Sequence, residues 1–138
     1  MAREARLGSV VTFVQQLDRS VAFYTELLGL DVADRDATAA LLMSADGSQL
    51  ILRAMGGNAP RPLGAVGVQY VVWTVAGPDE LDRCEQVLRG RQAYRDTRSF
   101  EGATAVEGRD PDDLPVIVTY PGPDEIPEHR LPLRIYGW

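Results

Sequence analysis

The sequence predicts an α+β fold made of two βαβββ modules, and three observations lead to this prediction. A β-branched segment runs straight into an amphipathic helical pattern at residues 9–30, and a second such passage occurs at residues 66–90. After the first passage come segments of strand length separated by turn signals. A strand and a helix that each have one apolar face need more sheet to bury both faces. Each passage is therefore expected to begin a module of its own.

The first module is expected to span residues 8–55. It begins with a strand at Ser9 to Val14, followed by a helix with Asp18 as its N-cap and Gly29 as its stop. The inward face of this helix is predicted to carry Val21, Tyr24, Leu27 and Leu28. Three further strands are predicted at residues 30–35, 39–44 and 48–54, the last two joined by a hairpin at Asp46-Gly47.

The second module is expected to span residues 66–120, after a linker at residues 56–65 and before a tail at residues 121–138. Val66 to Val75 is predicted as a strand, and Pro78-Asp79-Glu80 begins a helix that ends at Gly90. The inward face of this helix is assigned to Leu81, Cys84, Val87 and Leu88. Aligning the modules pairs Ser9 with Gln69, Gly29 with Gly90, Asp46 with Asp112, and residues 50–52 with 116–118. Residues 1–138 are expected to form one domain.

Composition narrows the class of protein. With 138 residues and 45% hydrophobic content, the chain can bury one core, and it has no apolar run long enough for a membrane span or a secretion signal. The single cysteine, Cys84, is expected to be a buried thiol, which favours the cytoplasm. A net charge of −6 argues against nucleic-acid binding, and the absence of lysine excludes Schiff-base chemistry.

Two motifs carry a resemblance to a known family. The segment from Phe13 to Leu30, FVQQLDRSVAFYTELLGL, and the segment from Gly108 to Pro115, GRDPDDLP, resemble the strand-to-helix signature and the closing hairpin of the glyoxalase, bleomycin-resistance and extradiol-dioxygenase group, the vicinal oxygen chelate superfamily. The resemblance covers residues 8–120, with Asp113 in place of the usual glycine. It implies curved mixed sheets around a cup with the helices outside. It also implies a homodimer whose modules pair within a chain or are exchanged between chains.

Strand alternation then predicts which side chains line the cup. If Val10, Thr12 and Val14 face the helices, then Ser9, Val11 and Phe13 face the cup. The same parity, with Pro115 as a further cup-facing position, gives the predicted ligand-binding residues: Ser9, Phe13, Gln49, Ile51, Arg53, Gln69, Val71, Trp73, Ile117 and Thr119. Such a lining of apolar and aromatic groups with a few polar ones suits a bulky, partly planar molecule, although a closed core is the alternative.

The resemblance also indicates where metal-using members hold a divalent cation. Those positions fall here on Ser9, Gln69, Ile51 and Ile117, which are poor or impossible ligands, so no metal or other cofactor is expected. The only histidine, His129, lies in the tail, and no Ser-His or Cys-His pair is visible. Asp34 with Asp36 and Asp110 with Asp112 are interpreted as strand-end or turn residues. No catalytic residue is therefore assigned.

The sequence thus favours a cytoplasmic, metal-free homodimer that captures a hydrophobic or aromatic natural product, plausibly an antibiotic, as the resistance proteins of this family do. The first alternative is a metal-independent isomerase or cyclisation enzyme in which Gln69, Arg53 or a tyrosine polarises the substrate. A metal-dependent lyase or dioxygenase is the second alternative. Ile135, Tyr136 and Trp138 in the tail are expected to dock, either on a dimer surface or over the cup mouth.

Overall fold

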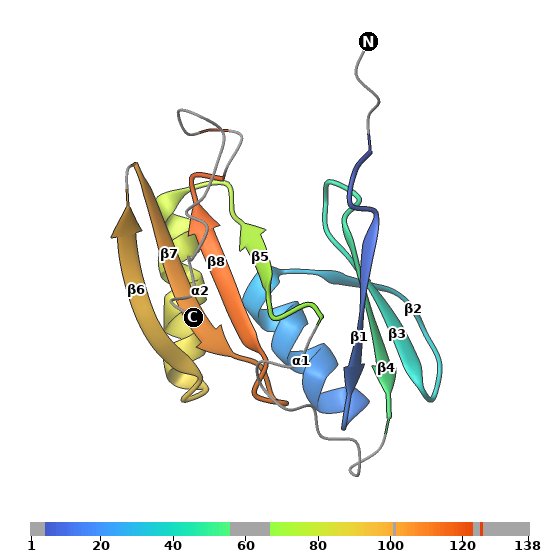
Figure 1. The fold of residues 1–138 in the computed structure, drawn as a ribbon. Helices are drawn as coiled ribbons and strands as arrows, with labels where there is room; N and C mark the ends of the chain where they lie inside the picture. Colours follow the sequence, from blue (N-terminus) through green and yellow to red (C-terminus); the bar gives the residue numbers. More distant parts are fainter. Residues whose placement is uncertain (1–4, 56–66, 101, 123–124, 126–138) are drawn as a thin grey trace. The chain divides into compact units, whose positions relative to one another are not determined.

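The computed structural model describes residues 5–55, 67–100, 102–122 and 125 (Figure 1). Its first module contains one helix and a four-stranded sheet: β1 (Ser9–Val14), α1 (Leu17–Leu28), β2 (Asp31–Arg35), β3 (Ala39–Met43) and β4 (Gln49–Ala54). The strand order is β1-β4-β3-β2, with β1 parallel to β4 and the other pairs antiparallel. The predicted strands and the hairpin at Asp46-Gly47 are present, within one residue at their ends.

Helix α1 begins two residues earlier than the predicted cap implies. Its N-cap is Gln16, which makes no side-chain capping bond, and Asp18 lies inside the first turn. There the Asp18 carboxylate forms an ion pair with Arg35 of β2 instead of capping the helix. The predicted stop is correct, because Gly29 has a φ of 65° and its N–H donates to the Thr25 carbonyl at 3.0 Å.

The core of this module lies between α1 and one face of its sheet. Leucines dominate it because alternate positions of β3 and β4 point toward the helix, where they meet the apolar stripe of α1. The fully buried side chains include Phe23, Leu27, Leu42 and Leu52. Leu28, predicted on the inward face, is only partly buried.

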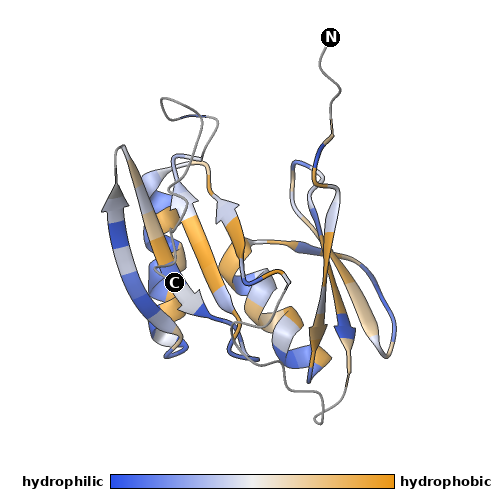
Figure 2. Cartoon of the chain, in the orientation of Figure 1, coloured by the Kyte–Doolittle hydropathy of each residue, from blue (hydrophilic) through white to orange (hydrophobic). Residues whose placement is uncertain are grey.

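The second module repeats the arrangement with β5 (Val71–Thr74), α2 (Pro78–Gly90), β6 (Tyr94–Phe100), β7 (Ala103–Arg109) and β8 (Pro115–Tyr120). The strand order is β5-β8-β7-β6, again with a parallel first pair and antiparallel neighbours. Strand β8 is apolar along most of its length, whereas β6 at the edge is largely hydrophilic (Figure 2). Strand β5 is shorter than predicted, since Gly67 to Tyr70 lie outside it and Val66 falls outside the described residues.

Helix α2 begins at Pro78 and ends at Gly90, as predicted. Leu81, Cys84 and Leu88 are buried, and Val87 is partly buried. Gly108 of β7 marks the side of the sheet that α2 covers, because a Cβ at this position would lie 2.6 Å from Leu88 Cδ2 and 2.9 Å from the Ala93 carbonyl oxygen. Only a glycine permits so close an approach of strand and helix.

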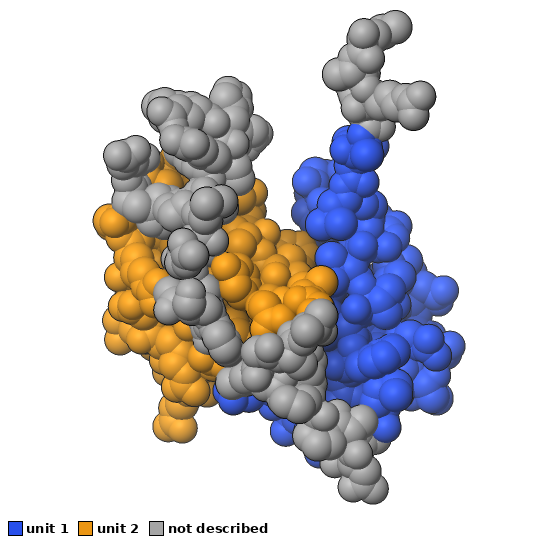
Figure 3. All heavy atoms as spheres, viewed as in Figure 1, with its two compact units in different colours: residues 1–65, 110–113 blue, residues 66–109, 114–138 orange. Residues whose placement is uncertain are grey.

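The residues form two compact units that follow the modules with one exception (Figure 3). The turn between β7 and β8, residues 110–113, groups with the first unit rather than the second. No helix in the described part of the chain is long and apolar enough to cross a membrane. His129 and the predicted docking residues of the tail lie outside the described residues.

Candidate functional site

The first candidate surface is the face of the first sheet that lies opposite α1, which we call the first open face. Strand register brings Ser9, Val11 and Phe13 beside Gln49, Ile51 and Arg53, so these six residues share one face as predicted. Phe13 and Val11 remain 59% and 54% exposed. The Arg53 guanidinium carbon lies 5.9 Å from the centre of the Phe13 ring, which is a cation–π distance.

Strand β3 adds three residues to the first open face that the list of predicted ligand-binding residues omits. Leu41 pairs with Ile51, Ala39 with Arg53 and Met43 with Gln49. Counting residues outward from the Asp46-Gly47 hairpin would have found them, because that turn fixes the register of β3 against β4. The first open face is therefore a broad apolar surface with Arg53 and Gln49 at its polar positions.

The second candidate surface is the face of the second sheet opposite α2, which we call the second inner face; unlike the first open face it is closed, since Ala105, Ile117 and Thr119 on it are buried. Ile117 and Thr119 of β8 lie on it, as the sequence predicts, since they alternate with the α2-facing Val116 and Val118. Ile117 forms a buried cluster with Ala105 of β7, and Tyr70 and Val72 pack against this cluster. The Thr119 hydroxyl donates to the Trp73 carbonyl at 3.4 Å, and its side chain is fully buried.

The prediction was wrong about β5. Val72 pairs with Ile117, whereas Val71 pairs with Val116 and Trp73 with Val118. Val71 and Trp73 therefore lie on the α2 face, not beside Ile117. The cause is a shift of one residue: Val72, not Val71, occupies the position that Val11 holds in β1. A one-residue shift moves every side chain of a strand to the opposite face.

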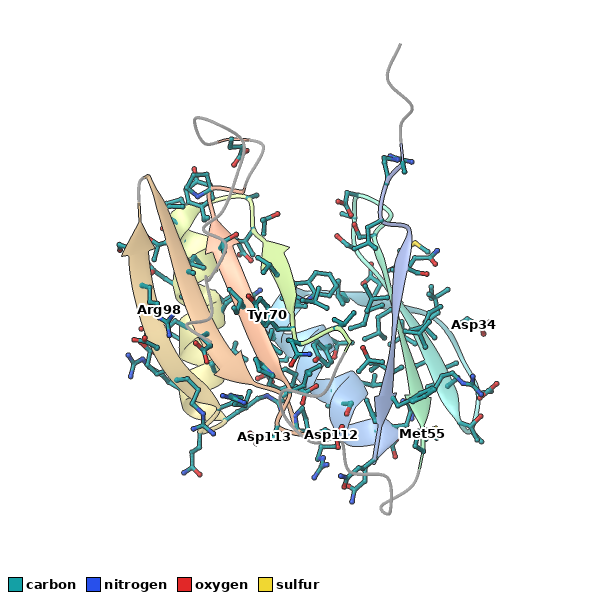
Figure 4. All side chains as sticks on the ribbon, viewed as in Figure 1. Asp34, Met55, Tyr70, Arg98, Asp112 and Asp113 are labelled. Carbon is teal, nitrogen blue, oxygen red and sulfur yellow. The ribbon has the colours of Figure 1, made fainter. Side chains whose placement is uncertain are left out.

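The same shift affects Gln69, which was aligned with Ser9. Counted from the pairing of Val72 with Ile117, the residue that matches Ser9 is Tyr70. Gln69 lies before β5, and its side-chain amide donates to the Gly67 carbonyl at 2.8 Å. Tyr70 is partly buried and lies just before β5 (Figure 4).

Strands β6 and β7 contribute charged residues to the second inner face that the sequence did not predict. Glu107 lies directly opposite Ile117 on one side and opposite Asp96 on the other. Arg98 of β6 pairs across from Ala105 and reaches Glu107, with Nη2 3.6 Å from Oε1, while its Nε donates to Asp96 at 3.0 Å (Figure 4). The signal in the sequence is a single glutamate inside the otherwise small and uncharged segment Ala103–Gly108.

Burial changes the chemistry of the Glu107 carboxyl group. Its side chain is 12% exposed. Desolvation raises the pKa of this carboxyl above its usual value, and the charges of Arg98, Arg109 and Arg95 only partly oppose that effect. A carboxyl group in such surroundings holds its proton more strongly than an exposed glutamate does, and when ionised it can accept a hydrogen bond.

A separate cluster of polar residues lies in the first unit and has a structural role. The buried Tyr24 hydroxyl donates to Asp110 Oδ2 at 2.7 Å, and Asp110 Oδ1 accepts the N–H of Asp112 at 2.8 Å. Asp112 in turn accepts the N–H of Gln15 at 3.3 Å. Burial and then the Asp110 charge raise the pKa of Tyr24 well above its usual value. These bonds join the two sequence motifs, and they bear out the turn-forming interpretation of Asp110 and Asp112.

The residues at the cation-binding positions implied by the family resemblance do not fit a divalent metal ion. Ser9 and Gln69 are neutral, weak ligands, Tyr70 replaces Gln69 when the register is followed, and Ile51 and Ile117 have no donor atom. Within residues 5–55, 67–100, 102–122 and 125, no three acidic, histidine or cysteine side chains come together as metal ligands. Cys84 is buried, and burial raises the pKa of its thiol, which disfavours the reactive thiolate.

Two modules, each with one helix packed on a four-stranded mixed sheet, define an α+β fold. Residues 6–115 match the model of the Glyoxalase/Bleomycin resistance protein/Dioxygenase superfamily, and the chain belongs to this family. The comparison with curated proteins finds no match.

Solved structures agree with the fold. A glyoxylase/bleomycin resistance protein/dioxygenase domain from Frankia sp. EAN1pec is 22% identical with a TM-score of 0.73, over 85% of this chain and 98% of that one. The lactoylglutathione lyase from Agrobacterium tumefaciens is 20% identical with a TM-score of 0.66, over 86% and 95% of the two chains. The oxidase ChaP-H1 is 18% identical with a TM-score of 0.66, over 84% and 95%. At these identities the likeness concerns the fold.

Proposed function

We propose that this chain is a cytoplasmic, homodimeric binding protein that captures a bulky hydrophobic or aromatic small molecule, such as an antibiotic, without a metal ion and without altering it. One observation carries the proposal: Ile51 and Ile117 stand where metal-using relatives place cation ligands, and both are surrounded by apolar side chains. Such surroundings favour binding by burial and stacking over Lewis-acid chemistry.

The first open face supports capture because its large side chains are exposed. The Phe13 ring beside the Arg53 guanidinium group forms a flat surface on which an aromatic molecule can stack. Ile51 and Leu41 extend this surface along the neighbouring strands. The proposal therefore expects ligand contacts at Phe13 and Ile51.

The test is native mass spectrometry of the protein purified from its own host, with elemental analysis of the same sample. Capture predicts a co-purifying organic compound that returns with unchanged mass after incubation with fresh protein, and less than a tenth of an equivalent of zinc, iron, nickel or manganese. About one tightly held metal ion per chain, or conversion of the compound by catalytic amounts of protein, would refute it.

A metal-independent enzyme is the second candidate, and Glu107 is the observation that favours it. A largely buried carboxyl group with a raised pKa is suited to proton transfer. If the compound is converted, Glu107→Gln should lower kcat by at least about 100-fold while changing the affinity little, since removing a general acid or base removes that much rate. An unchanged kcat in this variant would exclude Glu107 as the proton-transfer group.

A further inference from the structure

Arg53 on the first open face has hydrogen-bond donors that the described chain does not use. A guanidinium group carries five N–H donors and no acceptor. Within the described part of the chain, Arg53 contacts the Phe13 ring and forms no hydrogen bond or ion pair. A cation–π contact needs no acceptor atom, so the N–H groups of Arg53 remain available to an acceptor from outside the chain.

The surface beside Arg53 is open to solvent, unlike the second inner face. Phe13 and Val11 are 59% and 54% exposed, and Arg53 is exposed as well. Phe13 pairs with Arg53 across β1 and β4, and Val11 pairs with Ile51 in the same register. At about 4.8 Å between strands and about 3.3 Å per residue, these four side chains cover a patch of about 5 by 7 Å, roughly the size of two fused aromatic rings. The patch therefore has room for a planar ring system.

Carboxylates lie at the far edge of the same face. Asp31 and Asp34 of β2 stand opposite Met43 and Leu41 of β3, and Figure 4 shows Asp34 at this edge. They are two strands from Arg53, about 10 Å, which exceeds the Debye length of about 8 Å at physiological ionic strength. An anionic group of a ligand is therefore repelled at the β2 edge and attracted at Arg53, whereas a cationic group on Phe13 would meet the Arg53 charge.

Asp36, in the turn between β2 and β3, is a carboxylate within the electrostatic influence of Arg53, but its own turn holds it. Asp36 Oδ1 accepts the N–H groups of Thr38 and Ala39 at 2.8 and 2.9 Å. These two bonds are the main causes that lower the pKa of Asp36, and Arg53 has the smallest effect. Asp36 is also exposed, so water weakens its attraction to Arg53. The charge of Arg53 therefore stays available to a ligand.

We infer that the first open face binds an aromatic molecule that carries a carboxylate, with its ring on Phe13 and its carboxylate on the Arg53 guanidinium group. A carboxylate is planar and accepts two parallel N–H bonds from a guanidinium group, which fixes the orientation of the attached ring. The inference rests on the proposed function, because it names the ligand chemistry of the face that the proposal assigns to capture. It adds a charge requirement to a surface that is otherwise apolar.

Three naphthalene probes of similar size test the inference at pH 7 with the full chain. 2-Naphthoate is an anion, 2-naphthamide is its neutral counterpart of nearly the same shape, and 2-naphthylmethylamine is a cation. Affinities are measured by calorimetry on the wild type, Arg53→Gln and Phe13→Ala. Arg6→Gln is the control, because Arg6 is exposed and precedes the Ser9 end of β1, away from Phe13. Circular dichroism verifies that each variant is folded.

The wild type should bind 2-naphthoate about tenfold more tightly than 2-naphthamide, the low end of what a hydrogen bond to a charged group provides, because Arg53 is exposed. The amine should bind most weakly. The preference for 2-naphthoate should disappear in Arg53→Gln and persist in Arg6→Gln. Phe13→Ala should weaken 2-naphthoate and 2-naphthamide by a similar factor, since both carry the same ring system.

Equal binding of 2-naphthoate and 2-naphthamide, tightest binding of the amine, or a naphthoate preference that survives Arg53→Gln overturns the inference and leaves the proposed function standing. Affinities that Phe13→Ala does not change overturn it as well. Binding of none of the three probes also overturns it, whereas the proposed function is decided separately by the compound that co-purifies with the protein.

Discussion

At the level of single residues, one buried hydrogen bond joins the strand-to-helix motif to the closing hairpin motif. Tyr24 on α1 donates to Asp110 in the turn between β7 and β8 at 2.7 Å. A hydrogen bond to a charged acceptor contributes about 1.5–3 kcal/mol, so Tyr24→Phe should lower the free energy of unfolding by about that amount in a urea titration. Tyr94→Phe is the matched control, since the exposed Tyr94 hydroxyl only meets Thr97, and it should change stability by less than about 0.5 kcal/mol.

The raised pKa of Tyr24 adds a pH dependence. Because the folded protein keeps this hydroxyl protonated more strongly than the unfolded chain does, its contribution is complete below the unfolded value of 10.0 and is lost as the pH rises above it. The free energy of unfolding should therefore fall more steeply above pH 10 in the wild type than in Tyr24→Phe. Equal slopes in the two proteins would mean that Tyr24 ionises as freely in the folded state as in the unfolded one.

Glu107 gives a second prediction: whereas substituting Tyr24 should lower the stability of the fold, substituting Glu107 should raise it. Desolvation raises the pKa of this carboxyl in the folded state, so the unfolded chain releases its proton first as the pH rises through the usual range of glutamate. Ionised Glu107 then destabilises the fold. Glu107→Gln should unfold at a higher urea concentration than the wild type at pH 7, with the difference disappearing at about pH 3. A variant less stable than the wild type at pH 7 would show that the pair with Arg98 outweighs desolvation.

Strand register is the decisive feature at the level of the elements. Trp73 was expected to hold a ligand, but its pairing with Val118 places it on the α2 face. Trp73→Ala should therefore lower the free energy of unfolding by about 2–4 kcal/mol. This is somewhat less than the usual cost of truncating a large aromatic side chain in a core, because Trp73 is only partly buried. The affinity for the co-purifying compound should stay within about threefold of wild type in calorimetry. Phe13→Ala is the comparison, with the opposite pattern expected: a small loss of stability and weaker binding of aromatic ligands.

The elements themselves could be predicted because each leaves a local signal. Apolar periodicity, Pro78 and the glycines at positions 29 and 90 gave both helices within one or two residues, and Asp46-Gly47 fixed the register of the first hairpin. The N-cap was misplaced because the Asp18 carboxylate pairs with Arg35, a residue of another strand. The alternation of side chains predicted the correct face for the residues of β1, β4 and β8. The pairing register between strands that are distant in sequence, such as β5 and β8, leaves no mark in the local sequence. Glu107 did leave a local signal, because it is the single charged residue in the segment Ala103–Gly108, whereas the pairing of Arg98 with Ala105 leaves none.

The first open face is the basis for the proposed homodimer at the level of the whole molecule. Phe13 and Val11 are 59% and 54% exposed there beside Ile51 and Leu41. Exposed apolar residues gathered on one sheet face favour burial against a second chain, and a ligand stacked on Phe13 would then lie between the two chains. Sedimentation at micromolar concentration should therefore give a species of twice the 15.1 kDa chain mass.

Phe13→Asp should shift this equilibrium toward the monomer, because a charged carboxylate would have to leave water at the interface even though Arg53 lies beside it. A loss of about 3–5 kcal/mol raises the dissociation constant by more than 100-fold. Val68→Asp is the control: Val68 is 67% exposed but lies outside both sheets, so the same change of side chain should leave the dimer intact. A wild type that sediments as a single 15.1 kDa species at these concentrations would contradict the proposed homodimer. Equal dissociation in the two variants would instead place the dimer contact away from the first open face.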